Sequence, residues 1–243
     1  MRVIILAAGY GTRLYPLTLD LPKPLICINN KPIINFLIDK IEDLRNYYSI
    51  EETKLVSNNK FYNKFLAWKK EYKVEIQILN DGSTSPEDRL GAVRDIKFAI
   101  DGKGGDWLVL GGDNLFEDNL RGFLEFGLKK KPYPCIGIYD VKDKSAACHY
   151  GVTELDSGNQ IVSFEEKPKN PKSTLAATCV YFFPQDSLKL FDSFFSQVKA
   201  SDASGEYIKW MVDKTRVYGY IFEKKWFDIG GSDALKMAEK TFM

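Results

Sequence analysis

The sequence predicts an α/β protein with a Rossmann-like, three-layer arrangement, in which a central mixed, mainly parallel sheet is flanked by helices. Three observations lead to this fold class. Short β-branched runs alternate with amphipathic helical stretches in the first half, which is the pattern of βαβ units. Loops rich in glycine and polar residues follow several of these runs. A glycine-containing turn joins two strand-like runs within residues 151–164, which indicates an antiparallel hairpin in the second half.

The expected elements of the first half follow in order. Residues 3–7 are β-branched and apolar, as in a buried strand, and they lead into a glycine-containing loop. Pro32 suits the first turn of the next helix, whose apolar positions form one stripe. The periodicity predicts helices at 33–44, at 61–72 and from about residue 89, and strands at 54–57, 74–79 and 107–110.

The second half continues with a helix at 120–128 and a strand at 135–139. The hairpin pairs residues 151–155 with 160–164, and a further strand follows at 176–183. Helices are expected at 188–195 and 207–212, a strand at 216–222 and a last helix at 232–240.

The composition is typical of one large domain that binds small molecules. The 243 residues are 44% hydrophobic, which allows a substantial core. The net charge of +1 argues against nucleic acid as a partner. Since the N-terminus has no signal-peptide pattern and no apolar run has the length of a membrane span, we expect a cytoplasmic protein without a membrane partner.

The cysteines and the histidine do not indicate a metal cluster or a nucleophilic pair. Their spacing lacks the C-x-x-C pattern, so we expect buried free thiols at Cys27, Cys135, Cys148 and Cys179. His149 is the only histidine, and we expect it to be structural or exposed.

The loop after the first strand is suited to a polyphosphate. Gly9 and Gly11 lack a Cβ, so main-chain N–H groups can close around anionic oxygens. Arg13 and Lys23 add two cations, and the prolines on both sides of Lys23 hold it on an extended segment. Taken alone, the two glycines would suit a tight turn equally well.

Charged side chains also follow later strands. Asp113 comes directly after the strand at 107–110, where a carboxylate can reach Mg²⁺ on phosphate oxygens, although it also suits an ordinary turn. Residues 80–86 are rich in loop-forming types and follow another strand, which is where open α/β sheets bind ligands. Lys167 precedes a proline and Asp228 precedes a glycine turn, and a solvated charge run and a turn cap are the alternative interpretations.

Several of these stretches resemble the motifs of one enzyme family, the sugar-phosphate nucleotidyltransferases, also called NDP-sugar pyrophosphorylases. The run LAAGYGTRL at 6–14, followed by PKPL at 22–25, is similar to the family signature. The similarity is to the thymidylyltransferase-like members in particular. The runs GDN at 112–114, EKP at 166–168 and WFDIGG at 226–231 resemble the later motifs in the same order. The resemblance therefore covers nearly the whole chain.

The resemblance implies a fold, a domain organisation and a reaction. We expect the nucleotidyltransferase fold as a single domain over 1–243, with a nucleotide-binding half at 1–115 and a sugar-phosphate-binding half at 116–243. The implied reaction is Mg²⁺-dependent transfer of a nucleoside monophosphate from an NTP, with dTTP or UTP favoured, to a sugar 1-phosphate. In-line attack would give NDP-sugar and pyrophosphate without a covalent intermediate, as in polysaccharide biosynthesis.

The resemblance also assigns roles to residues. Its catalytic group comprises Arg13, Lys23, Asp113, Lys167 and Asp228, with Asp113 and Asp228 as ligands of Mg²⁺. The expected nucleotide contacts are Leu6, Ala8, Gly9, Gly11, Thr12, Arg13, Asn80, Asp81, Leu90 and Gly91. The expected sugar-phosphate contacts are Gly151, Glu166, Lys167 and Thr178. Departures from the family pattern occur at Arg89 and Cys179, where many relatives have glycine, and at Gly231, where threonine is usual.

Other functions stay open at this point. A dinucleotide-dependent oxidoreductase would need a third glycine and a helix opening directly after the loop, and the sequence has neither. A regulatory homologue that binds NDP-sugar without making it would be expected to lack a charged site residue. A cytidylyl- or guanylyltransferase acting on another phosphorylated acceptor is a third alternative. Relatives often self-associate, so a homo-oligomer is also open.

Overall fold

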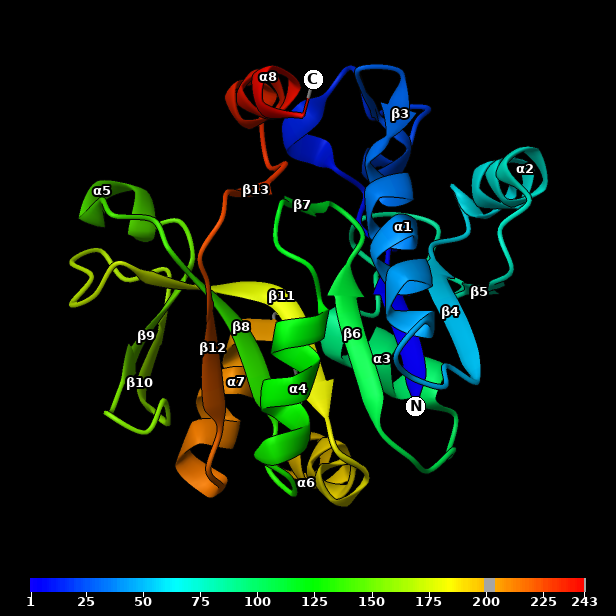
Figure 1. The fold of residues 1–243 in the computed structure, drawn as a ribbon. Coiled ribbons are helices and arrows are strands. Elements are labelled where there is room, and N and C mark those ends of the chain that lie inside the picture. Colours follow the sequence, from blue (N-terminus) through cyan, green and yellow to red (C-terminus); the bar gives the residue numbers. More distant parts are fainter. Residues whose placement is uncertain (199–203, 243) are drawn as a thin grey trace.

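The computed structural model describes residues 1–198 and 204–242. Its main feature is a nine-stranded sheet with helices on both faces, so the predicted α/β fold with a mixed sheet is confirmed (Figure 1). The order β10-β9-β11-β6-β1-β4-β5 accounts for seven strands, and β8 and β12 continue from β11. Among the described residues, no helix has the length and apolar character needed to cross a membrane.

The first half of the chain forms the parallel part of the sheet. Strand β1 (Arg2–Leu6) lies at its centre and pairs in parallel with β4 (Glu52–Ser57) and β6 (Trp107–Gly111). Strand β5 (Gln77–Asn80) pairs in parallel with β4. The connecting helices are α1 (Ile33–Arg45), α2 (Tyr62–Tyr72) and α3 (Ala92–Ile100), which confirms the predicted βαβ units.

The second half adds the antiparallel strands. Strand β11 (Leu175–Phe183) runs antiparallel to β6, to β8 (Cys135–Asp140) and to β9 (Gly151–Leu155). The predicted hairpin is confirmed, because β10 (Ile161–Glu166) pairs with β9. Strand β12 (Tyr218–Phe222) lies parallel to β8 at the far edge.

Two layers of helices bury the faces of the sheet. One face packs against α1, α2 and α4 (Arg121–Lys129), with Phe65, Trp68 and Phe123 buried between them. The opposite face packs against α3, α6 (Lys189–Gln197) and α7 (Ser204–Lys214), and Phe191 and Tyr207 stack there with ring centroids 4.8 Å apart. These three layers leave the carboxyl ends of the parallel strands open to a ligand.

Short ribbons and helices complete the fold at this end of the sheet. Strands β2 (Cys27–Ile28) and β3 (Lys31–Pro32) pair with each other, as do β7 (Asn114–Phe116) and β13 (Trp226–Asp228). Helix α8 (Ser232–Thr241) follows β13, and α5 (Lys144–Ala147) precedes β9. Single 3₁₀ turns lie at Thr12–Leu14, Lys23–Leu25 and Gln185–Ser187.

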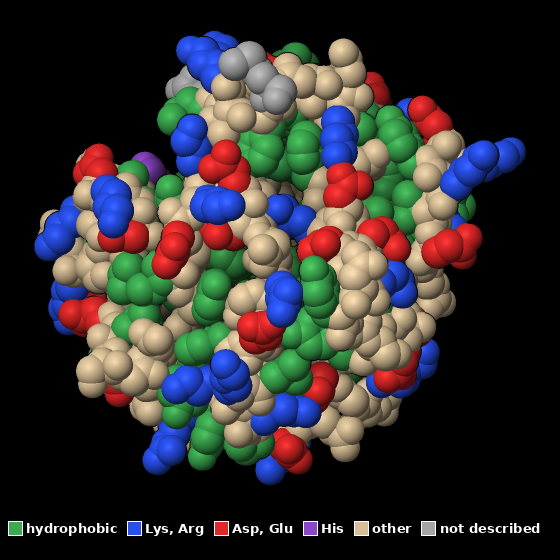
Figure 2. All heavy atoms as spheres, viewed as in Figure 1, with side chains coloured by type: hydrophobic (Ala, Val, Ile, Leu, Met, Phe, Trp, Pro, Cys, Tyr) green, Lys and Arg blue, Asp and Glu red, His purple; other side chains and the backbone are tan. Residues whose placement is uncertain are grey.

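The structure differs from the sequence-based expectations in several details. Helix α3 begins at Ala92 rather than near 89, because its N-cap Gly91 has a φ of 85°, a conformation that favours glycine. The strand expected from 74 begins at Gln77. The four cysteines are free, as expected, but only Cys135 is buried: Cys148 and Cys179 are partly exposed, and Cys27 is exposed because it lies on the short β2 ribbon outside the main sheet. Basic and acidic side chains are interspersed over the face in Figure 2.

Candidate active site

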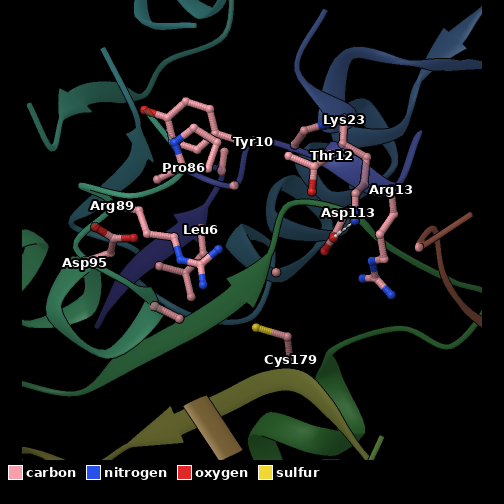
Figure 3. A pocket seen from close by; sticks show the side chains of 18 of the residues that line it. Leu6, Tyr10, Thr12, Arg13, Lys23, Pro86, Arg89, Asp95, Asp113 and Cys179 are labelled. Carbon is pink, nitrogen blue, oxygen red and sulfur yellow. Dashed lines mark hydrogen bonds and ion pairs between the residues drawn. The ribbon is translucent and has the colours of Figure 1, made fainter. Parts of the chain in front are cut away.

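A cavity of about 400 Å³ opens where β1 and β6 end, at the edge predicted to bind a ligand. Its two ends differ in chemistry. Figure 3 shows Arg13, Lys23 and Asp113 at one end, and Tyr10, Pro86, Arg89 and Asp95 at the other. Predicted nucleotide contacts line it at Leu6, Ala8, Gly9, Gly11, Thr12, Arg13 and Gly91. We call it the nucleotide cavity after the predicted nucleotide contacts that line it.

The glycine loop is held in place by its own backbone and by one buried amide. Asn58 Nδ2 donates to the carbonyl of Ala8 at 2.9 Å, and Thr18 Oγ1 donates to the carbonyl of Gly11 at 2.7 Å. Gly11 has a φ of 65°, and a Cβ there would lie 3.1 Å from the Thr18 side chain. A larger residue at this position would therefore be strained in backbone and in packing.

Lys23 and Asp113 form an ion pair at the charged end. Lys23 Nζ donates to Asp113 Oδ2 at 2.6 Å, and both side chains are mostly buried. The 3₁₀ turn that begins at Lys23 and the β6–β7 turn position the two groups, and Gly112 N donates to the carbonyl of Leu6 at 2.8 Å. The Arg13 guanidinium lies against Gly230, where a Cβ would be 3.3 Å from its Nη1.

The β7–β13 ribbon brings Asp228 to the same place. Asp228 pairs in register with Asn114, so it lies beside Asp113 although 115 positions separate them in the sequence. Trp226 Nε1 donates to Asn114 Oδ1 at 2.7 Å and fixes the ribbon. Burial, followed by the negative charge of Asp113, raises the pKa of Asp228 to about 6. Lys23, Arg13 and Lys167 oppose this rise, so the other four predicted catalytic groups all act on the carboxylate of Asp228.

A second cavity of about 240 Å³ adjoins the first, and we call it the acceptor cavity. The two share Arg13, Asp113 and Cys179 as lining residues. The predicted residues Gly151, Glu166, Lys167 and Asp228 line the acceptor cavity. The five predicted catalytic residues therefore gather where the two cavities meet.

The acceptor cavity is enclosed by the end of β10 and the start of α7. Glu166 ends β10 and lies close to Gly205, where a Cβ would be 1.8 Å from its Oε2. Lys167 Nζ is 3.6 Å from Glu166 Oε1, and Lys167 has a φ of 45°. This backbone conformation is uncommon outside glycine and asparagine, and functional sites are among the places where it occurs.

Four predicted contacts do not line either cavity. Thr178 is buried and its Oγ1 donates to the carbonyl of Gly137, because strand alternation turns its neighbours toward the acceptor cavity instead. Leu90 lines a separate surface hollow near Phe98. Asn80 and Asp81 hold their own loop, since Asn80 accepts from Gly82 N and Asp81 accepts from Ser83 N and Oγ.

The structure also adds lining residues that the sequence-based interpretation did not assign. The nucleotide cavity gains Tyr10, Pro86, Arg89, Ala92 and Asp95, and the acceptor cavity gains His149, Tyr150, Tyr181, Ser204, Gly205 and Trp226. His149 is exposed, as expected, and it also lines the acceptor cavity. For Asp95 a signal was present in the sequence, because a carboxylate interrupts the apolar stripe of α3.

Comparisons with known proteins identify the family of the chain. A family model described as nucleotidyl transferase matches residues 2–242. The bifunctional protein GlmU of Methanocaldococcus jannaschii is 32% identical over 234 residues, covering 95% of this chain and 51% of that protein. A protein of Sulfolobus acidocaldarius, provisionally named mannose-1-phosphate guanyltransferase, is 30% identical over 231 residues, covering 93% of this chain and 59% of that protein. The chain thus spans about half the length of the curated relatives it matches.

A solved structure supports the fold independently. A Bacillus anthracis protein, provisionally named glucose-1-phosphate thymidylyltransferase, matches with a TM-score of 0.84 at 23% identity, covering 99% of this chain and 94% of that chain. This likeness concerns the fold alone. The family model covers nearly all of the sequence, as the ordered motifs do. This chain therefore belongs to the nucleotidyl transferase family.

Proposed function

We propose that this chain transfers a nucleoside monophosphate from an NTP to a sugar 1-phosphate, releasing pyrophosphate. The observation that carries the proposal is the convergence of five charged side chains where two cavities meet. A larger cavity with a charged end suits an NTP, and the smaller adjoining cavity suits a phosphorylated acceptor. In-line attack by one phosphate on another needs this arrangement of two adjacent anion sites.

The cations would bind and orient the two phosphorylated substrates. Arg13 and Lys23 would hold the phosphates of the NTP, and Lys167 would hold the phosphate of the acceptor. The ion pair between Lys23 and Asp113 would loosen as phosphate oxygens approach Lys23, because the two anions compete for one ammonium. Charge neutralisation of this kind lowers the repulsion between the reacting groups and stabilises the developing charge on pyrophosphate.

The residues present fit a Mg²⁺ ion. Asp113 and Asp228 lie close enough for one to raise the pKa of the other, and both offer hard carboxylate oxygens. Within residues 1–198 and 204–242, no third His, Cys, Asp or Glu joins them in a metal-binding group. That donor set suits Mg²⁺, which is commonly bound by one or two carboxylates together with substrate phosphates. When bound, the ion would neutralise phosphate charge as a Lewis acid.

Glu166 would orient the sugar in the acceptor cavity. Its carboxylate lies beside Gly205 and next to Lys167, so it can accept hydrogen bonds from sugar hydroxyls while Lys167 holds the phosphate. Cys179 lines both cavities and stands where many relatives have glycine, so its side chain would narrow the passage between them. The identity of the sugar would depend on this narrowed space.

The test is pyrophosphate release with Mg²⁺ across a matrix of nucleotides and sugar 1-phosphates. The matrix contains dTTP, UTP, CTP, GTP and ATP against glucose and mannose 1-phosphates, since one relative is named for mannose 1-phosphate. Asp113→Asn is the inactive variant. Asp192→Asn is its matched control, because Asp192 is an exposed partner of Lys97 and lines neither cavity.

Two results would decide the proposal. Release that needs both substrates, that Asp113→Asn abolishes and that Asp192→Asn leaves unchanged would establish the transferase. No release with any pair, from protein that still binds nucleotide or NDP-sugar, would contradict the proposal and favour the regulatory homologue or another phosphorylated acceptor.

A further inference from the structure

Asp95 has an unusual place in the nucleotide cavity. Among the described residues it is the only carboxylate that is fully buried, with 4% of its surface exposed. It lies in the first turn of α3 and lines the nucleotide cavity at the end away from Lys23 and Asp113 (Figure 3). Its Oδ1 has no hydrogen-bond partner. An unpartnered buried carboxylate oxygen is costly, so its position calls for a ligand that donates hydrogen bonds.

A second unpartnered oxygen belongs to the same region. Asp81 uses Oδ1 to accept from Ser83 N and Ser83 Oγ, both at 2.7 Å, while its buried Oδ2 has no partner. Asp81 is near enough to Asp95 for its charge to act on that carboxyl. This end of the nucleotide cavity therefore holds one buried acceptor without a partner in the protein, Asp95 Oδ1, and a second such acceptor, Asp81 Oδ2, lies in the neighbouring loop outside the cavity lining.

A helix cap does not account for Asp95. The N-cap of α3 is Gly91, and no side chain caps the first turn. Asp95 itself is the fourth residue of the helix, and its own N–H donates to the carbonyl of Gly91 at 3.0 Å. The positive end of the helix dipole would favour a negative charge here, but it provides no partner for Oδ1.

We propose that Asp95 reads the base of the bound nucleotide and selects one that carries an exocyclic amino group, guanine above the others. This inference rests on the proposed function, because it places the base at the end of the cavity opposite the phosphate-facing cations. Guanine presents N1–H and N2–H side by side, which matches the two oxygens of one carboxylate. Uracil and thymine present one N–H between two carbonyl oxygens, so a carbonyl oxygen of the base would face a carboxylate oxygen of Asp95.

The electrostatics of the site agree with this assignment. Burial, followed by the negative charge of Asp81, raises the pKa of Asp95 to about 7. Two N–H donors from a base would stabilise the ionised carboxylate that burial disfavours. This assignment differs from the dTTP or UTP that the sequence resemblance favours. It attributes the choice of base to a side chain of α3.

The experiment measures kcat/KM for GTP, ATP, CTP, UTP and dTTP with a saturating sugar 1-phosphate. The variants are Asp95→Asn and a matched control on the same helix, Asp101→Asn, whose side chain is exposed at the C-cap. We expect the wild type to favour GTP, and Asp95→Asn to lower the GTP to UTP ratio by about 10- to 100-fold, the range found for losing one bidentate base contact. Asp101→Asn should leave the ratio unchanged.

Nucleotide binding without acceptor separates this inference from the proposed function. Titration calorimetry with GTP and UTP, on wild type and Asp95→Asn, reports base choice even from protein that shows no turnover. Preference for GTP that Asp95→Asn removes, with no turnover by any pair, would keep the base assignment and overturn the transferase.

Other results bear on the base assignment alone. A preference for ATP or CTP that Asp95→Asn removes would support the contact to an amino group. Turnover that favours UTP or dTTP, or a GTP to UTP ratio that Asp95→Asn leaves unchanged, would overturn the base assignment while leaving the transferase standing. Urea unfolding of both variants would show whether either substitution disturbs the fold.

Discussion

Replacing Asp95 with Asn should change how the stability of the ligand-free protein depends on pH. Asp95 is buried in the folded chain, and burial with the neighbouring Asp81 raises its pKa to about 7. In the unfolded chain an aspartate has its ordinary pKa of about 4. The folded state therefore holds a proton that the unfolded state releases, so the free energy of unfolding falls as pH rises through this window.

The size of the effect follows from the two pKa values. The loss begins near pH 4, where the unfolded chain ionises, and it is complete above about pH 7, where the folded carboxyl also ionises. A full shift of this size corresponds to about 4 kcal/mol, of which about 2 to 3 kcal/mol falls between pH 5 and pH 8. Asp95→Asn carries no titrating group, so its stability relative to wild type should rise by that amount over the same interval.

Urea unfolding at pH 5 and pH 8, without nucleotide, measures this difference directly. The exposed carboxylate of Asp101 on the same helix supplies the control, and Asp101→Asn should follow the wild type at both pH values. The reasoning would be refuted if the free energies of unfolding of Asp95→Asn and wild type differed by the same amount at pH 5 and at pH 8. That result would mean that the pKa of Asp95 is the same in the folded and the unfolded chain.

Three further outcomes are expected. Lys23→Met removes a cation that we propose binds the phosphates of the NTP, so pyrophosphate release should fall by about 10²- to 10³-fold, and a loss of less than tenfold would contradict this role. Gly205→Ala places a Cβ where Glu166 Oε2 would be 1.8 Å away, so the KM for the sugar phosphate should rise about tenfold. An equal rise in the KM for the NTP would indicate general distortion instead. Trp226→Phe removes the Nε1–H that Asn114 accepts at 2.7 Å, so the free energy of unfolding should fall by about 1–3 kcal/mol in urea titrations, and unchanged stability would argue against this contact.

Local patterns were sufficient to predict most of the sheet and helices. The run at 3–7 became the central strand β1, because a segment buried on both faces reads as continuous apolar sequence. Helix α1 could be predicted because its apolar residues recur with helical periodicity on the side that faces the core. The hairpin of β9 and β10 could be predicted because its turn residues lie next to each other in the chain.

The β7–β13 ribbon could not be predicted in the same way. Each strand has three residues, which is too short for a periodic pattern, and the partners lie more than 100 positions apart. Only folding brings Asp228 beside Asp113, and the raised pKa of Asp228 depends on its burial and on the nearby charge of Asp113. The sequence motifs identify the two aspartates as candidate site residues, whereas the β7–β13 ribbon brings them next to each other.

Asp95 and Thr178 illustrate the same limit at the level of single side chains. The sequence alone was enough to indicate the fold class, the order of elements and the family motifs, because these depend on neighbouring residues. Which side chains reach a cavity depends on strand twist, helix rotation and loop conformation, which are set by contacts across the whole chain. Packing therefore turned Thr178 toward Gly137, and it left Asp95 buried at the end of the nucleotide cavity with one oxygen unpartnered.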